Sequence, residues 1–195
     1  MKQAYLILLF IGLLSVSGCK NPSITLSIAD FGAKPDSREN ASIYAQRLIA
    51  RLQEVENNNH VTVTFPKGVY HFYEDSAFVR EYYISNHDQD NPKKVGFALE
   101  NLNNITIDGQ GSEFIFHGRM VPFSLLNSKN ISLKNFSIDF EVPALRQLNV
   151  LEVNKEKDEL IAEIYPGGNY RIENGRLIFV GETYEIAPVA SMSFR

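Results

Sequence analysis

One segment of the sequence occurs in two similar copies, and this repeat constrains the fold more than any other feature. Residues 96–107 (GFALENLNNITI) and residues 122–133 (PFSLLNSKNISL) align without a gap. Matching Phe, Leu, Asn and Ile residues lie 26 positions apart, as Phe97 and Phe123 do. A fixed period of about 20 to 50 residues is typical of stacked repeats, in which one copy is too small to bury its own apolar face.

The composition of the repeat indicates what kind of stack it forms. Each copy holds two short stretches that alternate between apolar and polar residues, which is the pattern of half-buried strands. Between them lie Asn-rich corners at residues 101–104 and 127–130, where Asn tolerates left-handed backbone angles and can stack into a hydrogen-bonded ladder. A leucine-rich repeat would need regularly spaced leucines and a helix in each copy, and this repeat shows neither. We therefore predict an all-β fold, a right-handed parallel β-helix, in which Ile105 and Ile131 are neighbours one strand spacing apart.

The first 19 residues predict an export signal. A basic start at Lys2 is followed by the apolar run Ala4–Leu14, which is too short to span a bilayer, where about 20 residues are needed. The tetrapeptide VSGC that ends at Cys19 resembles the lipobox of bacterial lipoproteins, in which the cysteine is lipidated, typically with palmitate. We expect an exported lipoprotein anchored in a membrane through Cys19, in the periplasm or at the outer membrane, with residues 20–25 as a tether.

The charge balance argues against nucleic acid as a partner. The chain has 19 basic and 23 acidic residues, a formal net charge of −4. Nucleic-acid binding relies on clustered Lys and Arg, and no such surplus is present. Cys19 is the only cysteine, so the fold depends on its core and not on an intramolecular disulfide.

Residues 26–143 are expected to form the first coils of the β-helix. A strand over residues 27–36 should run into a turn, and a helix should begin near Glu39 with Ala45, Leu48 and Leu52 on one apolar face. Alternating strands follow at residues 61–65 and 69–72. An amphipathic helix in this position can cover the open end of a stack.

Two motifs in this part resemble a known superfamily. Residues 30–36 (DFGAKPD) and residues 63–70 (VTFPKGVY) resemble the opening of the pectate-lyase-like β-helix superfamily, which hosts many functions. Further along, residues 82–89 (YYISNHDQ), 107–120 (IDGQGSEFIFHGRM) and 135–141 (NFSIDFE) resemble the N-terminal part of glycoside hydrolase family 110. The resemblance covers the chain from about Leu26 onward.

What the family does supplies the functional expectation. Its members are exo-acting bacterial α-1,3-galactosidases that remove terminal galactose, including that of the blood group B antigen, with inversion. The resemblance implies that this chain is the first third of a longer enzyme acting on galactose-terminated glycans. It also implies that the catalytic aspartates lie in later coils, beyond residue 195, so that the chain alone is inactive.

Residues 144–195 show a different pattern. Strand-like runs at residues 148–153, 160–164 and 176–180 are separated by charged or Gly-containing turns, and the 26-residue offset is lost. The pair Asn174-Gly175 is a strong hairpin signal. We predict an inserted antiparallel β-barrel that is truncated, as the family resemblance also implies.

Inverting hydrolysis needs two carboxyl groups about 6.5–9.5 Å apart, so outward carboxylates are the first candidates for chemistry. Asp139 and Glu141 share a face by alternation, although a solvated coil edge is the simpler interpretation. His117 and Arg119 are candidates for a polar clamp on a sugar or on a neighbouring subunit of a homo-oligomer, against a plain surface loop. Asp108 is expected to shape the turn that follows it. His87, Asp88 and Asp90 have no second histidine at metal spacing, so we predict no metal site and no cofactor.

Alternatives remain open at this point. Another carbohydrate-active β-helix, such as a polygalacturonase-like hydrolase or a pectate lyase, would share the superfamily motifs. A lyase needs an outward Lys or Arg base and acidic calcium ligands on neighbouring coils, and the sequence has no such cluster. A non-enzymatic glycan-binding solenoid would lack paired carboxylates in the complete gene.

Overall fold

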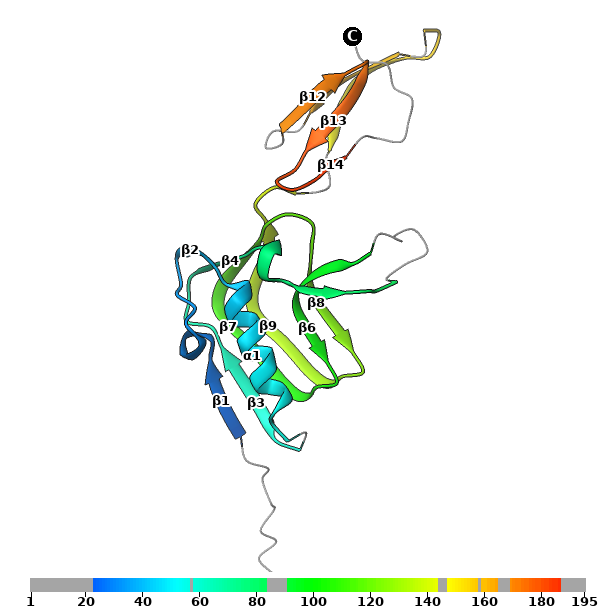
Figure 1. Ribbon diagram of the computed structural model, residues 1–195. Coiled ribbons are helices and arrows are strands. Elements are labelled where there is room, and N and C mark those ends of the chain that lie inside the picture. Colours follow the sequence, from blue (N-terminus) through cyan, green and yellow to red (C-terminus); the bar gives the residue numbers. More distant parts are fainter. Residues whose placement is uncertain are drawn as a thin grey trace, which may run out of the picture.

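The computed structural model describes residues 23–56, 58–83, 91–143, 147–157, 159–164 and 169–186. Cys19 and the predicted signal, the segment from His87 to Asp90 and the last nine residues lie outside the described part of the chain. Figure 1 shows a curled arrangement of mostly parallel strands with an α-helix against it, followed by antiparallel strands. We call residues 23–143 the parallel region and residues 148–186 the antiparallel region.

Parallel strands pair in register along the largest sheet. Its first part consists of β1 (Ser23–Ser27), β3 (His60–Thr64), the first half of β7 (Asn103–Phe116) and the first half of β9 (Lys129–Phe140). Val61 pairs with Ile105, and Ile105 pairs with Ile131. The predicted neighbour relation between the two copies of the repeat is confirmed.

Two further sets of strands complete the parallel region. One consists of β2 (Ser37–Asn40), β4 (Val69–Phe72) and the second halves of β7 and β9. The other consists of β6 (Lys93–Glu100) and β8 (Met120–Leu126), with β5 (Phe78–Arg80) antiparallel to β6. Phe97 pairs with Phe123, again as the repeat predicts. The chain is thus an all-β protein with a curled parallel sheet.

The Asn-rich corners adopt the predicted left-handed conformation. Asn101, Asn104, Asn127 and Asn130 have φ angles of 56°, 58°, 51° and 55°. The side-chain amide of Asn130 donates to the side-chain oxygen of Asn104 at 2.9 Å, which forms one step of an Asn ladder. The 26-residue spacing therefore places two asparagines where their side chains form a hydrogen bond with each other.

The bend in the middle of β7 depends on Gly109 for space. A Cβ at Gly109 would lie 2.5 Å from the Cβ of Phe136 and 2.8 Å from the carbonyl oxygen of Asn135. The positive φ angles of the bend belong to Gln110 and Gly111, at 51° and 83°. Asp108 accepts a hydrogen bond from the Gln110 amide at 3.0 Å, which confirms its predicted role in the turn.

Aromatic rings from successive strands form much of the core. The rings of Phe97 and Phe123 are stacked with centroids 4.6 Å apart, and so are those of Phe114 and Phe136. Phe97 and Phe114 are fully buried. Burying one such side chain stabilises the fold by about 1.5–3 kcal/mol.

Helix α1 (Ser42–Gln53) packs on the same core, as predicted from its apolar spacing. Ala45, Leu48 and Leu52 are buried against it. The backbone amide of Ser42 donates to the side-chain oxygen of Asn40 at 2.9 Å, which satisfies one free amide at the helix start. Figure 1 shows the helix beside the strands of the parallel region, where it contacts β6.

The start of the chain differs from the prediction. Strand β1 begins at Ser23, inside the range assigned to the tether. Residues 27–36 were predicted as a strand running into a turn, but the expected strand part is a 3-10 turn, η1 (Ile28–Phe31). Ser27 accepts a hydrogen bond from the Ala29 amide, and Asp30 accepts one from the Ser27 amide. These two side chains satisfy the backbone locally and so favour the turn over an extended strand. A second short turn, η2 (Glu74–Ser76), follows β4.

The antiparallel region contains two small sheets. Strands β10 (Leu148–Asn154) and β11 (Glu159–Ile164) pair with each other, and β13 (Arg176–Val180) pairs with both β12 (Asn169–Glu173) and β14 (Glu185–Ile186). The hairpin turn at Asn174 and Gly175, with φ angles of 50° and 73°, is confirmed. The sequence predicts turns between residues 164 and 176 and does not predict β12, which forms by pairing with β13 from Asn169 opposite Val180.

The last strands of the parallel region expose apolar side chains. Leu125, Leu126 and Ile138 keep about half of their surface exposed, at 51%, 47% and 45%. Among the described strands, β8 pairs only with β6, and β9 pairs only with β7. No helix in the described part of the chain is long and apolar enough to cross a membrane.

Candidate functional site

Polar side chains gather where β4, β7 and β9 end. Tyr70 and Phe72 point into the core, so His71 and Tyr73 lie on the outer side of β4. Phe72 pairs with Phe116, and the His117 amide donates to the Phe72 carbonyl at 2.9 Å. The pairing of β4, β7 and β9 thus brings residues from three neighbouring strands to one edge of the sheet.

The two histidines of this cluster contact each other directly. The Nδ1 atom of His71 lies 2.8 Å from the Nε2 atom of His117. Only 7% of His71 and 4% of His117 is exposed. The ring of Tyr73 stacks on His117 with centroids 3.9 Å apart and planes 13° apart, which holds the imidazole in one orientation.

Glu182, from the antiparallel region, covers the outer side of His117. Its Oε1 atom lies 2.8 Å from the Nδ1 atom of His117, and its Oε2 atom accepts a hydrogen bond from the Gly118 amide at 2.9 Å. An ionised carboxylate only accepts hydrogen bonds, so His117 carries its proton on Nδ1. The Nε2 atom of His117 therefore presents a lone pair toward His71.

Glu141 follows β9 at the same edge and is ion-paired with Arg38. Its Oε1 atom lies 2.7 Å from the Nη2 atom of Arg38. The Arg38 guanidinium holds the pKa of Glu141 below its usual value, mainly through this hydrogen bond. Burial lowers the pKa of His71, and the positive charge of Arg38 lowers it further. These two shifts favour a neutral His71 imidazole beside an ionised Glu141 carboxylate.

Potential ligand atoms of three side chains in this cluster lie close together. One atom each from His71, His117 and Glu141 lies within 4.8 Å of the others. Two imidazoles and one carboxylate form a donor set that binds divalent transition metals in proteins. The sequence-based prediction of no metal site considered only residues 87–90, which lie outside the described part of the chain.

Each of the four predicted site residues has a definite place. Asp139 is exposed and accepts a hydrogen bond from the Phe140 amide at 2.8 Å. Glu141 is bound to Arg38. His117 was expected in a surface loop and is instead buried, because Tyr73 and Glu182 cover it. Arg119 is exposed, as a loop residue should be, and its backbone amide donates to Glu74.

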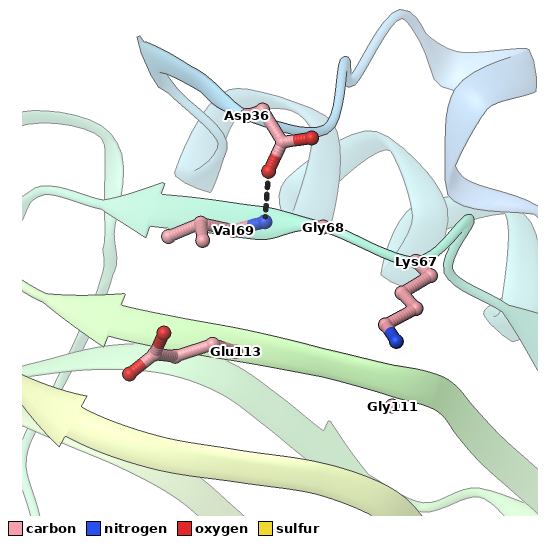
Figure 2. Close-up of a pocket in the computed structure, with 6 residues that line it drawn as sticks. All are labelled: Asp36, Lys67, Gly68, Val69, Gly111 and Glu113. Carbon is pink, nitrogen blue, oxygen red and sulfur yellow. Dashed lines mark hydrogen bonds between the residues drawn. The ribbon is translucent and has the colours of Figure 1, made fainter.

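A shallow hollow lies on the outside of the turns near β4 and β7. It has a volume of about 430 Å³ and is lined by Asp36, Lys67, Gly68, Val69, Gly111 and Glu113. Figure 2 shows the Asp36 carboxylate against the Val69 amide, with which it forms a 3.0 Å hydrogen bond, and the Lys67 side chain reaching toward Gly111. One ammonium and two carboxylates can bind sugar hydroxyls, but an open hollow encloses little of a ligand.

A third polar cluster lies on the outer side of β6 and β8. The Nε atom of Arg80 lies 2.9 Å and 3.0 Å from the two carboxylate oxygens of Glu100. Tyr82 donates to Glu100 and lies 3.2 Å from the hydroxyl of Ser124. The hydrogen bond from Arg80 lowers the pKa of Glu100, which keeps this carboxylate ionised and bound to its neighbours. The cluster stabilises the attachment of β5 to β6.

Comparison with known proteins shows what the chain is similar to. No family model matches the sequence. A relative from Bacteroides fragilis named "Alpha-1,3-galactosidase B" is 52% identical over 160 residues, which is 82% of this chain and 27% of the relative. A relative of the same name from Phocaeicola vulgatus is 53% identical over 74% of this chain and 24% of its own length. The chain is thus similar in sequence to part of these proteins named α-1,3-galactosidase.

A more distant galactosidase gives the same result. "Alpha-1,3-galactosidase A" from Shewanella woodyi is 41% identical over 172 residues, 86% of this chain and 28% of the relative. The chain spans about a quarter of the length of the curated galactosidases that it matches. The similarity therefore covers most of the described residues of this chain but only part of the galactosidases themselves.

Sequence reasoning did not bring His71 and His117 together. They are 46 residues apart and the 26-residue repeat does not relate them. The signal that was available is the alternation of aromatic residues: Tyr70 and Phe72 have the same spacing as Phe114 and Phe116. Aligning these pairs would have placed His117 next to Tyr73, two residues beyond His71. No pattern in the sequence indicated the contact with Glu182.

Proposed function

We propose that the protein to which this chain belongs is an exo-acting, inverting α-1,3-galactosidase. It would remove terminal galactose from blood group B type or linear α-1,3-galactosyl glycans. The observation that carries this proposal is the identity of 44–53% with several proteins named α-1,3-galactosidase B over most of the chain. Glycans that end in galactose are thus the substrate class.

The parallel region supports a β-helix as the scaffold. We infer that its strands are coils of a right-handed parallel β-helix over residues 26–143, and that residues 144–195 are part of an inserted antiparallel β-barrel. The in-register pairs from Val61 through Ile105 to Ile131, with Asn corners one above the other, favour this arrangement. Right-handed connections between parallel strands are the rule.

The candidate carboxylates of this chain are poorly suited to inverting hydrolysis. A general acid needs a pKa raised toward neutrality, and Arg38 lowers the pKa of Glu141. Asp139 is bound to the backbone of its own strand end. We therefore propose that the catalytic pair belongs to parts of the galactosidase that this chain does not cover.

The test compares the complete gene product with this chain. Both are purified and incubated with α-1,3-galactobiose, and galactose release is followed by nuclear magnetic resonance of the anomeric proton. The complete protein should release β-galactose first, as inversion requires, and residues 20–195 should release none. Initial release of α-galactose would contradict inversion, and release by residues 20–195 would place the catalytic pair in this chain.

The same chain is proposed to reach a membrane surface through lipidated Cys19. The lipobox-like VSGC sequence supports this location in the periplasm or at the outer membrane. Metabolic labelling with an alkyne-bearing fatty acid should label the wild-type protein, and Cys19→Ser should abolish the label. Labelling that survives in Cys19→Ser would overturn the assignment.

A further inference from the structure

We propose that His71, His117 and Glu141 form a binding site for a divalent transition metal ion, with zinc the best fit. The inference does not depend on galactosidase activity. It is carried by the position of the three side chains at the ends of β4, β7 and β9.

The donor set and its spacing suit zinc. Zinc is bound by imidazole nitrogen and carboxylate oxygen, with Zn–N distances of about 2.0–2.1 Å. Two nitrogens on one tetrahedral zinc are then about 3.3 Å apart. The facing nitrogens of His71 and His117 are 2.8 Å apart, so a small outward shift of one ring makes room for the ion. A fourth position would remain for water or another ligand.

The hydrogen bond to Glu182 orients His117 as metal-binding histidines are usually oriented. A histidine ligand commonly donates its second ring N–H to a carboxylate, which fixes the tautomer and strengthens the ligand. Glu182 accepts from Nδ1 of His117 and is itself held by the Gly118 amide. The lone pair on Nε2 is therefore directed toward Nδ1 of His71, one of the other two proposed ligands.

Burial and charge around the cluster also favour an ion. Both imidazoles are more than nine-tenths buried, and the ring of Tyr73 packs against His117. Such a shell excludes water from the two imidazoles and limits their motion, whereas Glu141 is exposed to solvent. The carboxylates of Glu141 and Glu182 together carry the charge that neutralises a divalent cation.

Arg38 is the group that opposes metal binding. Its guanidinium lies 2.7 Å from the Glu141 carboxylate and is 66% exposed at the side chain. An exposed ion pair contributes little to stability, so a metal ion can displace it. Removal of Arg38 should therefore strengthen metal binding, whereas a purely structural ion pair would give no such gain.

The test measures zinc and cobalt binding to the full chain. Isothermal titration with ZnCl₂ should show one equivalent bound, and CoCl₂ should produce the visible absorption of tetrahedral cobalt with nitrogen and oxygen ligands. His117→Gln and Glu141→Gln should each weaken zinc binding by about 100-fold or more. Glu182→Gln should weaken it by about 10- to 100-fold, as for other partners of ligating histidines. Arg38→Gln should strengthen it several-fold.

The other two histidines provide matched controls. The chain has four histidines, and His60→Gln and His87→Gln should leave zinc affinity unchanged. His60 lies on β3, is exposed, and contacts Thr106 at 3.2 Å. Circular dichroism melting of each variant separates loss of a ligand from loss of the fold. Absence of stoichiometric zinc binding by the wild-type chain, or unchanged affinity in folded His117→Gln, would overturn the proposal.

Discussion

Phe97 in the parallel region is fully buried and lies within 6.2 Å, between ring centroids, of four other phenylalanines, whereas Tyr170 in the antiparallel region keeps 52% of its surface exposed. Both residues lie in strands with satisfied backbone pairing. The difference lies in what covers the side chains. Strands of the parallel region share one core from several directions, while Leu151, Val153 and Ile161 remain about 60% exposed at 61%, 60% and 57%. Strand pairing alone does not bury apolar surface.

The largest expected effect is on stability, when a buried aromatic side chain of the parallel region and an exposed one of the antiparallel region are each truncated to alanine. Phe97→Ala should lower the free energy of unfolding by about 3–5 kcal/mol, because it removes a buried ring and leaves a cavity. Tyr170→Ala, an aromatic truncation on an exposed strand, should change it by about 0.5 kcal/mol. Urea unfolding of the full chain, followed by circular dichroism, measures both. Equal losses would show that the antiparallel region is packed as tightly as the parallel region.

The next effect compares two asparagines that both have positive φ. Asn130→Gly keeps the left-handed corner but removes the hydrogen bond to Asn104, and should cost about 0.5–1.5 kcal/mol. Asn130→Ala should cost about 1–2 kcal/mol more, because alanine resists this conformation. In the hairpin, Asn174→Gly should be close to neutral, since its left-handed backbone is retained.

Unfolding midpoints of the three variants, measured side by side, check this order. If the hydrogen bond between Asn130 and Asn104 contributes to stability, Asn130→Gly has a lower unfolding midpoint than Asn174→Gly. If the two glycine variants have the same midpoint, the Asn corners serve only the backbone turn.

The smallest effect compares two ion pairs by their pH dependence. The pKa of Glu100 is lowered from 4.5 by its hydrogen bond with Arg80, so its contribution is present above about pH 4.5 and is lost as pH falls through the lowered pKa. Wild type should exceed Glu100→Gln in stability by about 1 kcal/mol or less at neutral pH, and the difference should vanish in acid.

Glu185 is the matched carboxylate in the antiparallel region. Its hydrogen bonds with Arg171, at 2.6 Å and 2.8 Å, also lower its pKa, but the pair is exposed to solvent. Glu185→Gln should therefore have a smaller effect that disappears in high salt, whereas the half-buried pair of Arg80 and Glu100 is screened less. Denaturant midpoints across pH and salt measure both variants. If the stability effects of Glu100→Gln and Glu185→Gln depended equally on salt concentration, the expected difference between the two ion pairs would be contradicted.

Much of the parallel region could be predicted because its information is local and repeated. The 26-residue offset correctly paired Phe97 with Phe123 and Ile105 with Ile131, and the spacing of Ala45, Leu48 and Leu52 correctly placed the buried face of α1. The pair Asn174-Gly175 was enough by itself to predict the hairpin between β12 and β13. Each of these patterns specifies geometry within a few residues or at a constant interval.

The candidate site could not be predicted in the same way. His71 lies in β4 and His117 follows β7, and these two strands are not related by the 26-residue repeat. Glu182 comes from the antiparallel region. The turn at Ile28–Phe31 was taken for a strand, because the bonds made by Ser27 and Asp30 outweigh the apolar pattern. Contacts of this kind depend on the direction of individual side chains.

The sequence by itself determined the alternation, the corners and the interval at which they recur, since backbone conformation and side-chain polarity act over short distances. Only the tertiary structure decided which outward side chains meet: that His117 lies under Tyr73 and Glu182, and that Glu141 faces Arg38. Such meetings follow from how strands far apart in the chain are stacked and from what packs against their outer side. A local pattern along the chain does not predict this packing, because the packing depends on contacts between residues that are far apart in the sequence.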